Sequence, residues 1–173
     1  VTNEYIRIFK ELWTKDNPSF NGRFYQFPAV KFHPNPVQKP HPPIWVGGHS
    51  DPAIRRAATL GDAWFPIGLR GPVALEPEEM KKKIIQLNTL AKKANRESNS
   101  VGVSFSVELI FTNEMSNKNV PFSGSPEKIV DDIRKYEELG VNYFLFSFRS
   151  GSIREITSSM ERFASGIMPV FSK

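Results

Sequence analysis

The feature that most constrains the fold is a fourfold alternation of short apolar runs with amphipathic segments. Each apolar run has the length of a buried strand, and each following segment repeats its apolar residues at the spacing of a helix. Such alternation is typical of a parallel sheet with right-handed crossover helices. The sequence therefore predicts an α/β fold, with strands expected over 44–47, 62–68, 101–112 and 141–148 and helices over 51–60, 77–96, 125–140 and from 152 onward.

Residues that typically begin or end helices lie at the ends of the expected helices. Gly61 follows the first helix and is expected in the left-handed C′ conformation, and Gly140 is expected to stop the third. Ser125 and Pro126 open that third helix. The segment SIRE, residues 152–155, has the pattern of a capping box and predicts the start of the last helix.

The strand expected over 101–112 has two different faces. Its odd positions are all apolar, whereas Ser104, Ser106 and Glu108 occupy even positions. Because side chains alternate between the faces of a strand, one face is expected to enter the core and the other to carry polar groups. Glu108 is then expected either to line a pocket or to pair with a lysine.

A helix, a hairpin and a proline-rich arm precede the first strand–helix unit. Apolar residues at helical spacing predict a helix over 3–15 with Asn3 as its N-cap. The segment FNGRFYQF around Gly22 is expected to form a small hairpin. Six prolines then fall within 28–43. Since proline favours extended geometry for itself and for the residue before it, residues 16–43 are expected to form an ordered arm.

The junction between the first expected strand and helix, within PPIWVGGHSDPAIRRAATLGDAWFPIG (42–68), has the character of an anion site. Gly47 and Gly48 carry no side chains, so a phosphate can approach the backbone amides closely. The helix that begins near Asp51 adds unpaired N–H groups and a dipole worth about 0.3–1 kcal/mol. The Asp51 carboxylate must then point to solvent or cap the helix. The alternative interpretation is a tight strand-to-helix turn without a ligand.

Three segments together resemble one known family. PNPVQKPHPPIWVGGHSDPAIRRAATLGDAWFPIG, the earlier LWTKDNPSFNGRFYQF and the closing ITSSMERFASGIMPVF resemble the luciferase-like monooxygenases, and most closely their deazaflavin (coenzyme F420)-dependent branch. The resemblance extends over nearly the whole chain. It implies a (β/α)8 TIM-type barrel that holds a deazaflavin or FMN at the carboxyl ends of its strands, where the active sites of such barrels lie.

The resemblance also implies roles for individual residues. The cofactor phosphate would lie near the glycine pair and the following helix, and the end of the next strand would lie beside cofactor and substrate. The cofactor-binding residues expected on this basis are Gly47, Gly48, Ser50, Trp64, Ile67 and Gly68. The alternative for Trp64 is a place in the core.

Several basic residues are further candidates, each with an alternative. His49, inside the glycine turn, and Arg149, after the last strand, are candidates for contact with substrate or phosphate, and a surface salt bridge is the alternative for Arg149. Arg55 or Arg56 could reach a phosphate, although solvated surface positions are expected. The remaining histidines, His33 and His41, are expected at the surface, and no metal-ligand spacing is present.

The number of strands is the main departure from the family pattern. A complete barrel of this kind needs about 250 residues and eight strands, whereas this chain has 173 residues and four expected barrel strands. The matching segments belong to the C-terminal half of the family barrel. We therefore expect a single domain over 1–173 that forms half a barrel. Its open edges and uncovered apolar face are unfavourable, so we expect either a missing N-terminal half or a homo-oligomer.

Composition narrows the class of protein and its partners. The absence of cysteine excludes disulfides and thiolate chemistry, and we expect a cytoplasmic protein. No apolar stretch approaches the roughly 20 residues of a membrane span. The net charge of +5 favours an anionic ligand, and a deazaflavin with its acidic tail over FMN. The basic residues lack the interleaved aromatics of a nucleic-acid groove; they are densest at Lys81, Lys82, Lys83, Lys92 and Lys93.

The expected function is that of an oxidoreductase or monooxygenase segment, incomplete and inactive alone. It would use a deazaflavin or FMN for hydride transfer, or for oxygen-dependent oxidation of a small organic substrate. The first alternative is a non-catalytic half-barrel that binds flavin or phosphate, or that dimerises. The second is an unrelated doubly wound phosphate binder. No catalytic acid or base is predicted.

Overall fold

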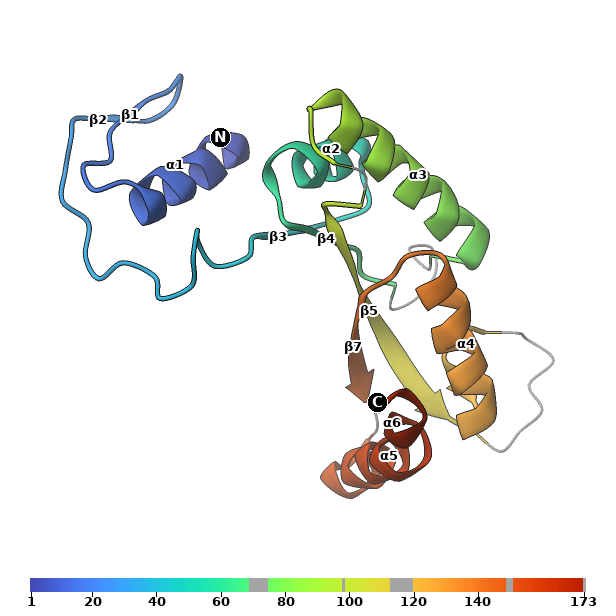
Figure 1. Cartoon of the computed structure of the whole chain (residues 1–173). Coiled ribbons are helices and arrows are strands. Elements are labelled where there is room, and N and C mark those ends of the chain that lie inside the picture. The colour runs from blue at the N-terminus through green and yellow to red at the C-terminus, as the bar shows by residue number, and fades with distance from the viewer. Residues whose placement is uncertain (69–74, 98, 113–119, 149–150, 173) are drawn as a thin grey trace.

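The computed structural model describes residues 1–68, 75–97, 99–112, 120–148 and 151–172 (Figure 1). Arg149, one of the predicted contacts to substrate, lies outside the described residues.

A parallel sheet forms the centre of the molecule. Its main strands are β3 (Trp45–Gly47), β4 (Ala63–Phe65), β5 (Gly102–Phe111) and β7 (Tyr143–Phe148), and they lie in the order β3-β4-β5-β7 with every pair parallel. The helices that follow them are α2 (Asp51–Leu60), α3 (Pro77–Lys93), α4 (Pro126–Glu138) and α5 (Ile153–Gly166). The predicted series of strand–helix units is confirmed.

The observed elements depart from the prediction in three short pieces. The strand expected over 62–68 is regular only at β4, and it continues as an isolated bridge between Ile67 and Ser106. A two-residue strand, β6 (Ser123–Gly124), pairs with the last two residues of β5. A one-turn helix, α6 (Met168–Phe171), follows α5. Segments this short show no periodicity, so they cannot be predicted from their sequences.

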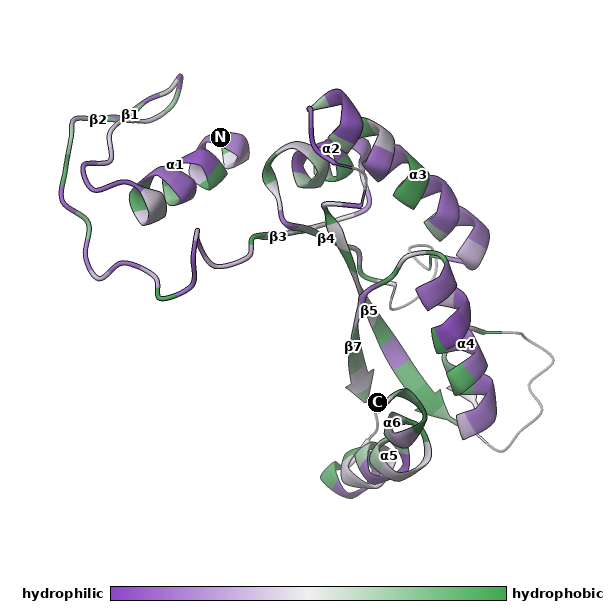
Figure 2. Cartoon of the chain, in the orientation of Figure 1, coloured by the Kyte–Doolittle hydropathy of each residue, from purple (hydrophilic) through white to green (hydrophobic). Residues whose placement is uncertain are grey.

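The core lies between the sheet and its helices. On β5 the residues Val103, Phe105, Val107 and Leu109 are all nearly fully buried. Phe105 packs against Tyr136 of α4, with ring centroids 5.2 Å apart, so the odd positions face the helices as predicted. Hydrophilic residues predominate on α3 and α4 (Figure 2), and the residues that these helices bury are apolar residues and one tyrosine.

The opposite face of the sheet is its inner face. It carries the even positions of β5 together with Trp45 from β3 and with Tyr143 and Leu145 from β7. These last three side chains are 42%, 52% and 48% exposed. Within the described part of the chain, no strand pairs with the outer edge of β3 or β7. The predicted combination of an uncovered apolar face and open edges is therefore present.

The N-terminal region packs beside this unit. Helix α1 (Thr2–Thr14) is followed by the predicted hairpin, in which β1 (Phe20–Asn21) pairs antiparallel with β2 (Gln26–Phe27). The chain then runs without helix or strand until β3, outside the sheet (Figure 1). The prediction of Asn3 as N-cap is wrong, since α1 already begins at Thr2.

The expected roles of Ser125, Gly140 and Ser152 at helix ends are confirmed, and the expected role of Gly61 is not. Ser152 caps α5 by accepting the amide of Glu155, and Gly140 has φ +108°. Gly61 instead has φ −86° and ψ 167°, so its predicted left-handed conformation is wrong. A Cβ atom there would lie 2.9 Å from Cγ2 of Val46, so close packing of α2 on β3 explains the glycine. None of the helices in the described ranges is long and apolar enough to span a membrane.

Candidate functional site

The candidate site is the loop formed by residues 47–50, which joins β3 to α2. Gly48 has φ +108°, a conformation that side chains disfavour, and a Cβ atom there would lie 3.2 Å from the Cβ of Ala53. Its amide donates to the carbonyl of Phe65 on β4 at 3.4 Å. Gly47 is exposed, and an added Cβ would meet only the Phe65 carbonyl, at 3.7 Å. The space in front of Gly47 is therefore open.

Side chains from the helix side of the sheet hold the Gly48 and His49 carbonyls of this loop. The indole Nε1 of Trp64 donates to the Gly48 carbonyl at 2.7 Å. The Nζ of Lys83, on α3, donates to the His49 carbonyl at 3.1 Å. Among the described residues, no group accepts a hydrogen bond from the His49 or Ser50 amides. The loop thus directs its carbonyls toward protein donors and leaves these two amides for another acceptor.

Helix α2 begins immediately after the loop. Ser50 is the N-cap residue, with φ −70° and ψ 153°, but its exposed hydroxyl makes no cap hydrogen bond. Asp51 follows, and Oδ1 of its carboxylate accepts a hydrogen bond from Nε2 of Gln86 on α3 at 3.0 Å. The carboxylate is therefore held at α3, which meets the requirement that it should not oppose an anion at the loop.

The imidazole of His49 connects the loop to the end of β4. Its Nε2 accepts the backbone amide of Ile67 at 3.0 Å, so this nitrogen carries no proton in that contact. His49 is half-buried, whereas Ile67 is 42% exposed. The structure brings these two predicted residues together. The sequence suggested a ligand contact for His49 and did not foresee the bridge to Ile67.

Two further predicted residues, Trp64 in β4 and Gly68 beyond its end, have mainly packing roles in this chain. Trp64 is fully buried beneath the loop, which corresponds to the core alternative. Gly68 donates its amide to the carbonyl of Ser106 at 2.8 Å. A Cβ atom at Gly68 would lie 2.4 Å from the ring of Phe105, so a side chain has no room there.

Lys83 is the site residue that the sequence analysis missed, because the lysine cluster that contains it was considered only as a possible nucleic-acid surface. Its side chain is only 19% exposed, and Glu79 lies 3.7 Å from its ammonium group. A signal was available in the sequence. The buried stripe of α3 includes Ile84 and Leu87, so Lys83 and Gln86 flank that stripe at helical spacing and can reach a neighbouring element.

A polar stripe lies on the inner face of β5. Ser104, Ser106 and Glu108 are 2%, 8% and 8% exposed. Glu108 lies in register with Ser147 of β7, close to the carboxyl end of β5. Glu108 therefore lies on the inner face of the sheet, a position that is consistent with both predicted alternatives, lining a pocket and pairing with a lysine.

The other basic candidates do not gather at the loop. The Nε of Arg56 donates to Asn3 at 2.8 Å and so ties α2 to α1, while Arg55 is exposed. His33 is exposed as expected. The expectation of a surface position for His41 is wrong, because its side chain is 9% exposed and its Nδ1 lies 2.9 Å from the Pro42 carbonyl.

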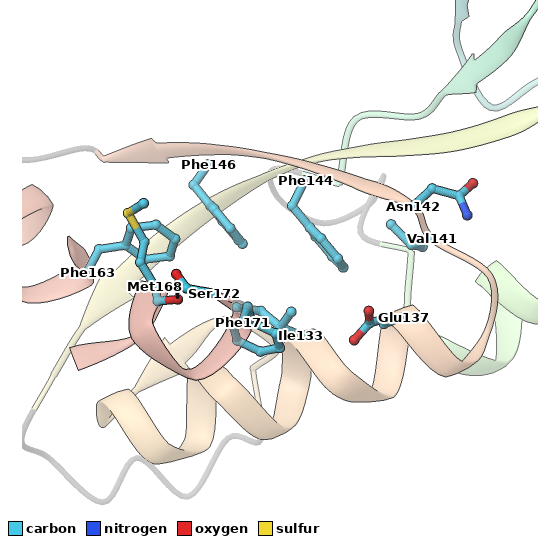
Figure 3. A pocket seen from close by; sticks show the side chains of 10 residues that line it. All are labelled: Ile133, Glu137, Val141, Asn142, Phe144, Phe146, Phe163, Met168, Phe171 and Ser172. Carbon is cyan, nitrogen blue, oxygen red and sulfur yellow. Dashed lines mark hydrogen bonds between the residues drawn. The ribbon is translucent and has the colours of Figure 1, made fainter. Parts of the chain in front are cut away.

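A second hollow lies away from the loop, on the helix side of β7 (Figure 3). Its volume is about 340 Å³, and aromatic rings dominate its lining. The rings of Phe144 and Phe146 stack with centroids 5.6 Å apart, and Phe163 of α5 completes one wall. No predicted site residue lines this pocket. Among the described residues, no group of His, Asp and Glu side chains could hold a metal ion.

Comparison with known proteins identifies relatives by their sequences. An FMNH2-dependent dimethylsulfone monooxygenase of Pseudomonas putida is 43% identical over 67 residues, which are 39% of this chain and 18% of that protein. An uncharacterized protein of Mycobacterium tuberculosis is 31% identical over 147 residues, 85% of this chain and 42% of that protein. The chain thus spans less than half the length of these curated relatives.

Solved structures define the fold. An F420-dependent secondary alcohol dehydrogenase, in complex with an F420–acetone adduct, superposes with a TM-score of 0.75 at 15% identity. The match covers 98% of this chain and 61% of that chain. The parallel sheet with its following helices is therefore a partial (β/α)8 barrel, as predicted.

The family can be stated from the match of a sequence model. The model that describes luciferase-like monooxygenases matches residues 1–117, which include α1, the arm, the loop 47–50 and all of β5. The resemblance inferred from the sequence segments is confirmed, and the chain belongs to the luciferase-like monooxygenase family.

Proposed function

We propose that this chain supplies the cofactor-phosphate region of a flavin- or deazaflavin-dependent oxidoreductase that acts on a small organic substrate. The observation that carries the proposal is the loop 47–50, whose His49 and Ser50 amides have no acceptor within the described part of the chain. A phosphate at the N-terminus of α2 would accept both amides and meet the positive end of the helix dipole. The FMNH2-dependent and F420-dependent relatives make such a phosphate the natural ligand.

Specific residues would hold the cofactor. Gly47 and Gly48 let the phosphate approach the backbone, and the free hydroxyl of Ser50 adds a donor at the same place. Ile67, exposed at the end of β4, would contact the cofactor beyond its phosphate, and Trp64 supports the loop from the core. The bound cofactor would supply hydride transfer or oxygen activation. The residues of this chain bind and orient it, and the buried polar stripe of β5 faces the same interior.

A second candidate function is a non-catalytic half-barrel that binds a flavin or associates with another polypeptide. The observation that favours it is the uncovered inner face, where Tyr143 and Leu145 are about half exposed. The unpaired outer edges of β3 and β7, among the described residues, point the same way. In this interpretation the barrel interior is an assembly surface.

Titration with FMN, coenzyme F420 and riboflavin, followed by cofactor fluorescence, tests both candidates. Ser50→Ala should weaken FMN binding several-fold, in line with about 0.5–1.5 kcal/mol for one hydrogen bond. Gly47→Val should weaken it further by blocking the approach to the amides. Ser165→Ala, on the exposed side of α5, is the matched control. Binding with turnover of reduced cofactor supports the oxidoreductase, and binding without turnover supports the module. Absence of binding rejects a cofactor role for this chain.

A further inference from the structure

We propose that Lys83 is a positioning residue that sets the direction of the amides in the phosphate loop. It would act through the His49 carbonyl, which its ammonium group holds at 3.1 Å. This inference rests on the proposed function, because it concerns the same phosphate. It adds a residue from a different helix, α3, which the glycine motif itself does not contain.

The geometry of the peptide bond carries the first step. In a planar trans peptide, the carbonyl of one residue and the amide N–H of the next point in opposite directions. The cis peptide bonds of the described chain precede Pro34 and Pro40, so the loop peptides are trans. A donor that fixes the His49 carbonyl therefore also fixes the Ser50 N–H on the opposite side.

The location of the two donors determines the direction in which the amides point. Trp64 is fully buried in the core and holds the Gly48 carbonyl, while Lys83 reaches the next carbonyl from α3. Both donors belong to the helix side of the sheet. The His49 and Ser50 amides consequently point away from the helix layer. A phosphate could approach them from this opposite side.

The positive charge of Lys83 also favours an anion at the loop. The Lys83 ammonium group donates to a carbonyl of the loop, and burial of its side chain to 19% exposure reduces the screening of its charge by water. It donates to the His49 carbonyl rather than neutralising Asp51, whose carboxylate is engaged by Gln86. The ammonium group thus places a positive charge behind these amides, partly offset by the exposed Glu79 carboxylate at 3.7 Å. Lys82, its exposed neighbour on α3, contacts neither the His49 carbonyl nor Asp51 among the described residues.

The decisive experiment compares FMN with riboflavin, since the two ligands differ only in the phosphate. We expect wild-type protein to prefer FMN and Lys83→Met to bind FMN about tenfold more weakly, as for loss of one charge-assisted hydrogen bond. Riboflavin affinity should be unchanged in Lys83→Met. Lys83→Arg should restore most of the FMN preference, and Lys82→Met should behave as wild type. If Lys83→Met keeps the full preference for FMN, the inference is wrong although the phosphate site stands.

A second readout needs no ligand and separates the inference from the proposed function. The ¹⁵N shift of an amide responds to hydrogen bonding at the carbonyl of its own peptide group. The Ser50 resonance should therefore move in Lys83→Met and return toward its position in Lys83→Arg, whereas Lys82→Met should leave it in place. An unmoved Ser50 resonance would overturn the positioning role. A moved resonance in a protein that does not distinguish FMN from riboflavin would overturn the proposed function and leave the positioning role intact.

Discussion

The rings of Trp45 and Tyr143 meet edge to face, with centroids 5.1 Å apart and planes at 70°, although β4 and β5 lie between their strands. In a flat sheet, three spacings of about 4.8 Å would separate β3 from β7 by about 14 Å. Side chains stand roughly perpendicular to a sheet, so this contact requires the sheet to curve toward its inner face. The strands therefore already have the curvature of a barrel wall, and the concave side is the one with exposed apolar residues.

Association through this concave face is the first prediction. Because Leu145 is 48% exposed on β7, the protein should associate with itself as its concentration rises, and Leu145→Glu should weaken that association at least about tenfold. Ile85→Glu, at an apolar position that is 59% exposed on α3, is the control and should have little effect. Sedimentation velocity measures both. A monomer at all concentrations, or equal effects of the two variants, would contradict the prediction.

The two glycines of the loop should respond differently to substitution. Gly48→Ala forces a side chain into φ +108° and against Ala53, so it should reduce the free energy of unfolding by about 1–3 kcal/mol. Gly47→Ala places its methyl group 3.7 Å from the nearest atom and should change stability by less than about 0.5 kcal/mol. Urea denaturation followed by tryptophan fluorescence distinguishes them. Equal losses in both variants would mean that backbone conformation does not decide the cost.

The strand–helix order and the two faces of β5 could be predicted because both depend on the local periodicity of apolar residues. The strand expected over 101–112 is observed as Gly102–Phe111, with its apolar positions toward the helices. Gly61 shows the limit of this approach. A glycine after a helix suggests a left-handed cap, but here the close approach of Val46 from β3 requires it, and that contact exists only in the folded chain.

The candidate site could be predicted in part for the same reason. Gly48 was singled out by the glycine pair, and its positive φ agrees with a special backbone conformation. The contacts of Lys83 and His49 depend on how α3 and the end of β4 pack against the loop. Nothing in the local sequence specifies that packing. The contact of Lys83 was accordingly missed, and the bridge from His49 to Ile67 was not foreseen.

Arg96 should be a strong determinant of stability. Its Nη1 donates to the Gly61 carbonyl at 2.7 Å and to the Ala58 carbonyl at 3.1 Å, so it satisfies the C-terminal end of α2. A cation there also interacts favourably with the helix dipole. Arg96→Met should lower the free energy of unfolding by about 1.5–3 kcal/mol. Thermal or urea denaturation measures the loss, and Arg55→Met, at an exposed position of α2, is the control. Similar losses in the two variants would contradict the capping role.

The carboxylate of Glu4 anchors the hairpin to α1. It accepts the backbone amides of Arg23, Phe24 and Tyr25 at 2.8, 3.0 and 3.2 Å. Desolvation acts to raise the pKa of Glu4, but these three hydrogen bonds to the charged form together lower it below its usual value of 4.5. A carboxyl group whose pKa is lower in the folded state stabilises that state above its unfolded pKa, and the contribution disappears as pH falls through the folded pKa.

The last prediction therefore concerns acid pH, and it isolates one carboxyl group. The amide proton of Phe24 should keep its shifted NMR position down to pH 4.5 and then move, with a midpoint below 4.5, as Glu4 becomes protonated and releases the hairpin. Glu4→Gln should abolish this transition, because the amide side chain does not titrate in that range. Glu11→Gln, on the same helix, should leave the transition unchanged. A midpoint above 4.5, or the same transition in Glu4→Gln, would show that another group holds the hairpin, since the three amides of residues 23–25 report on the carboxylate that accepts them.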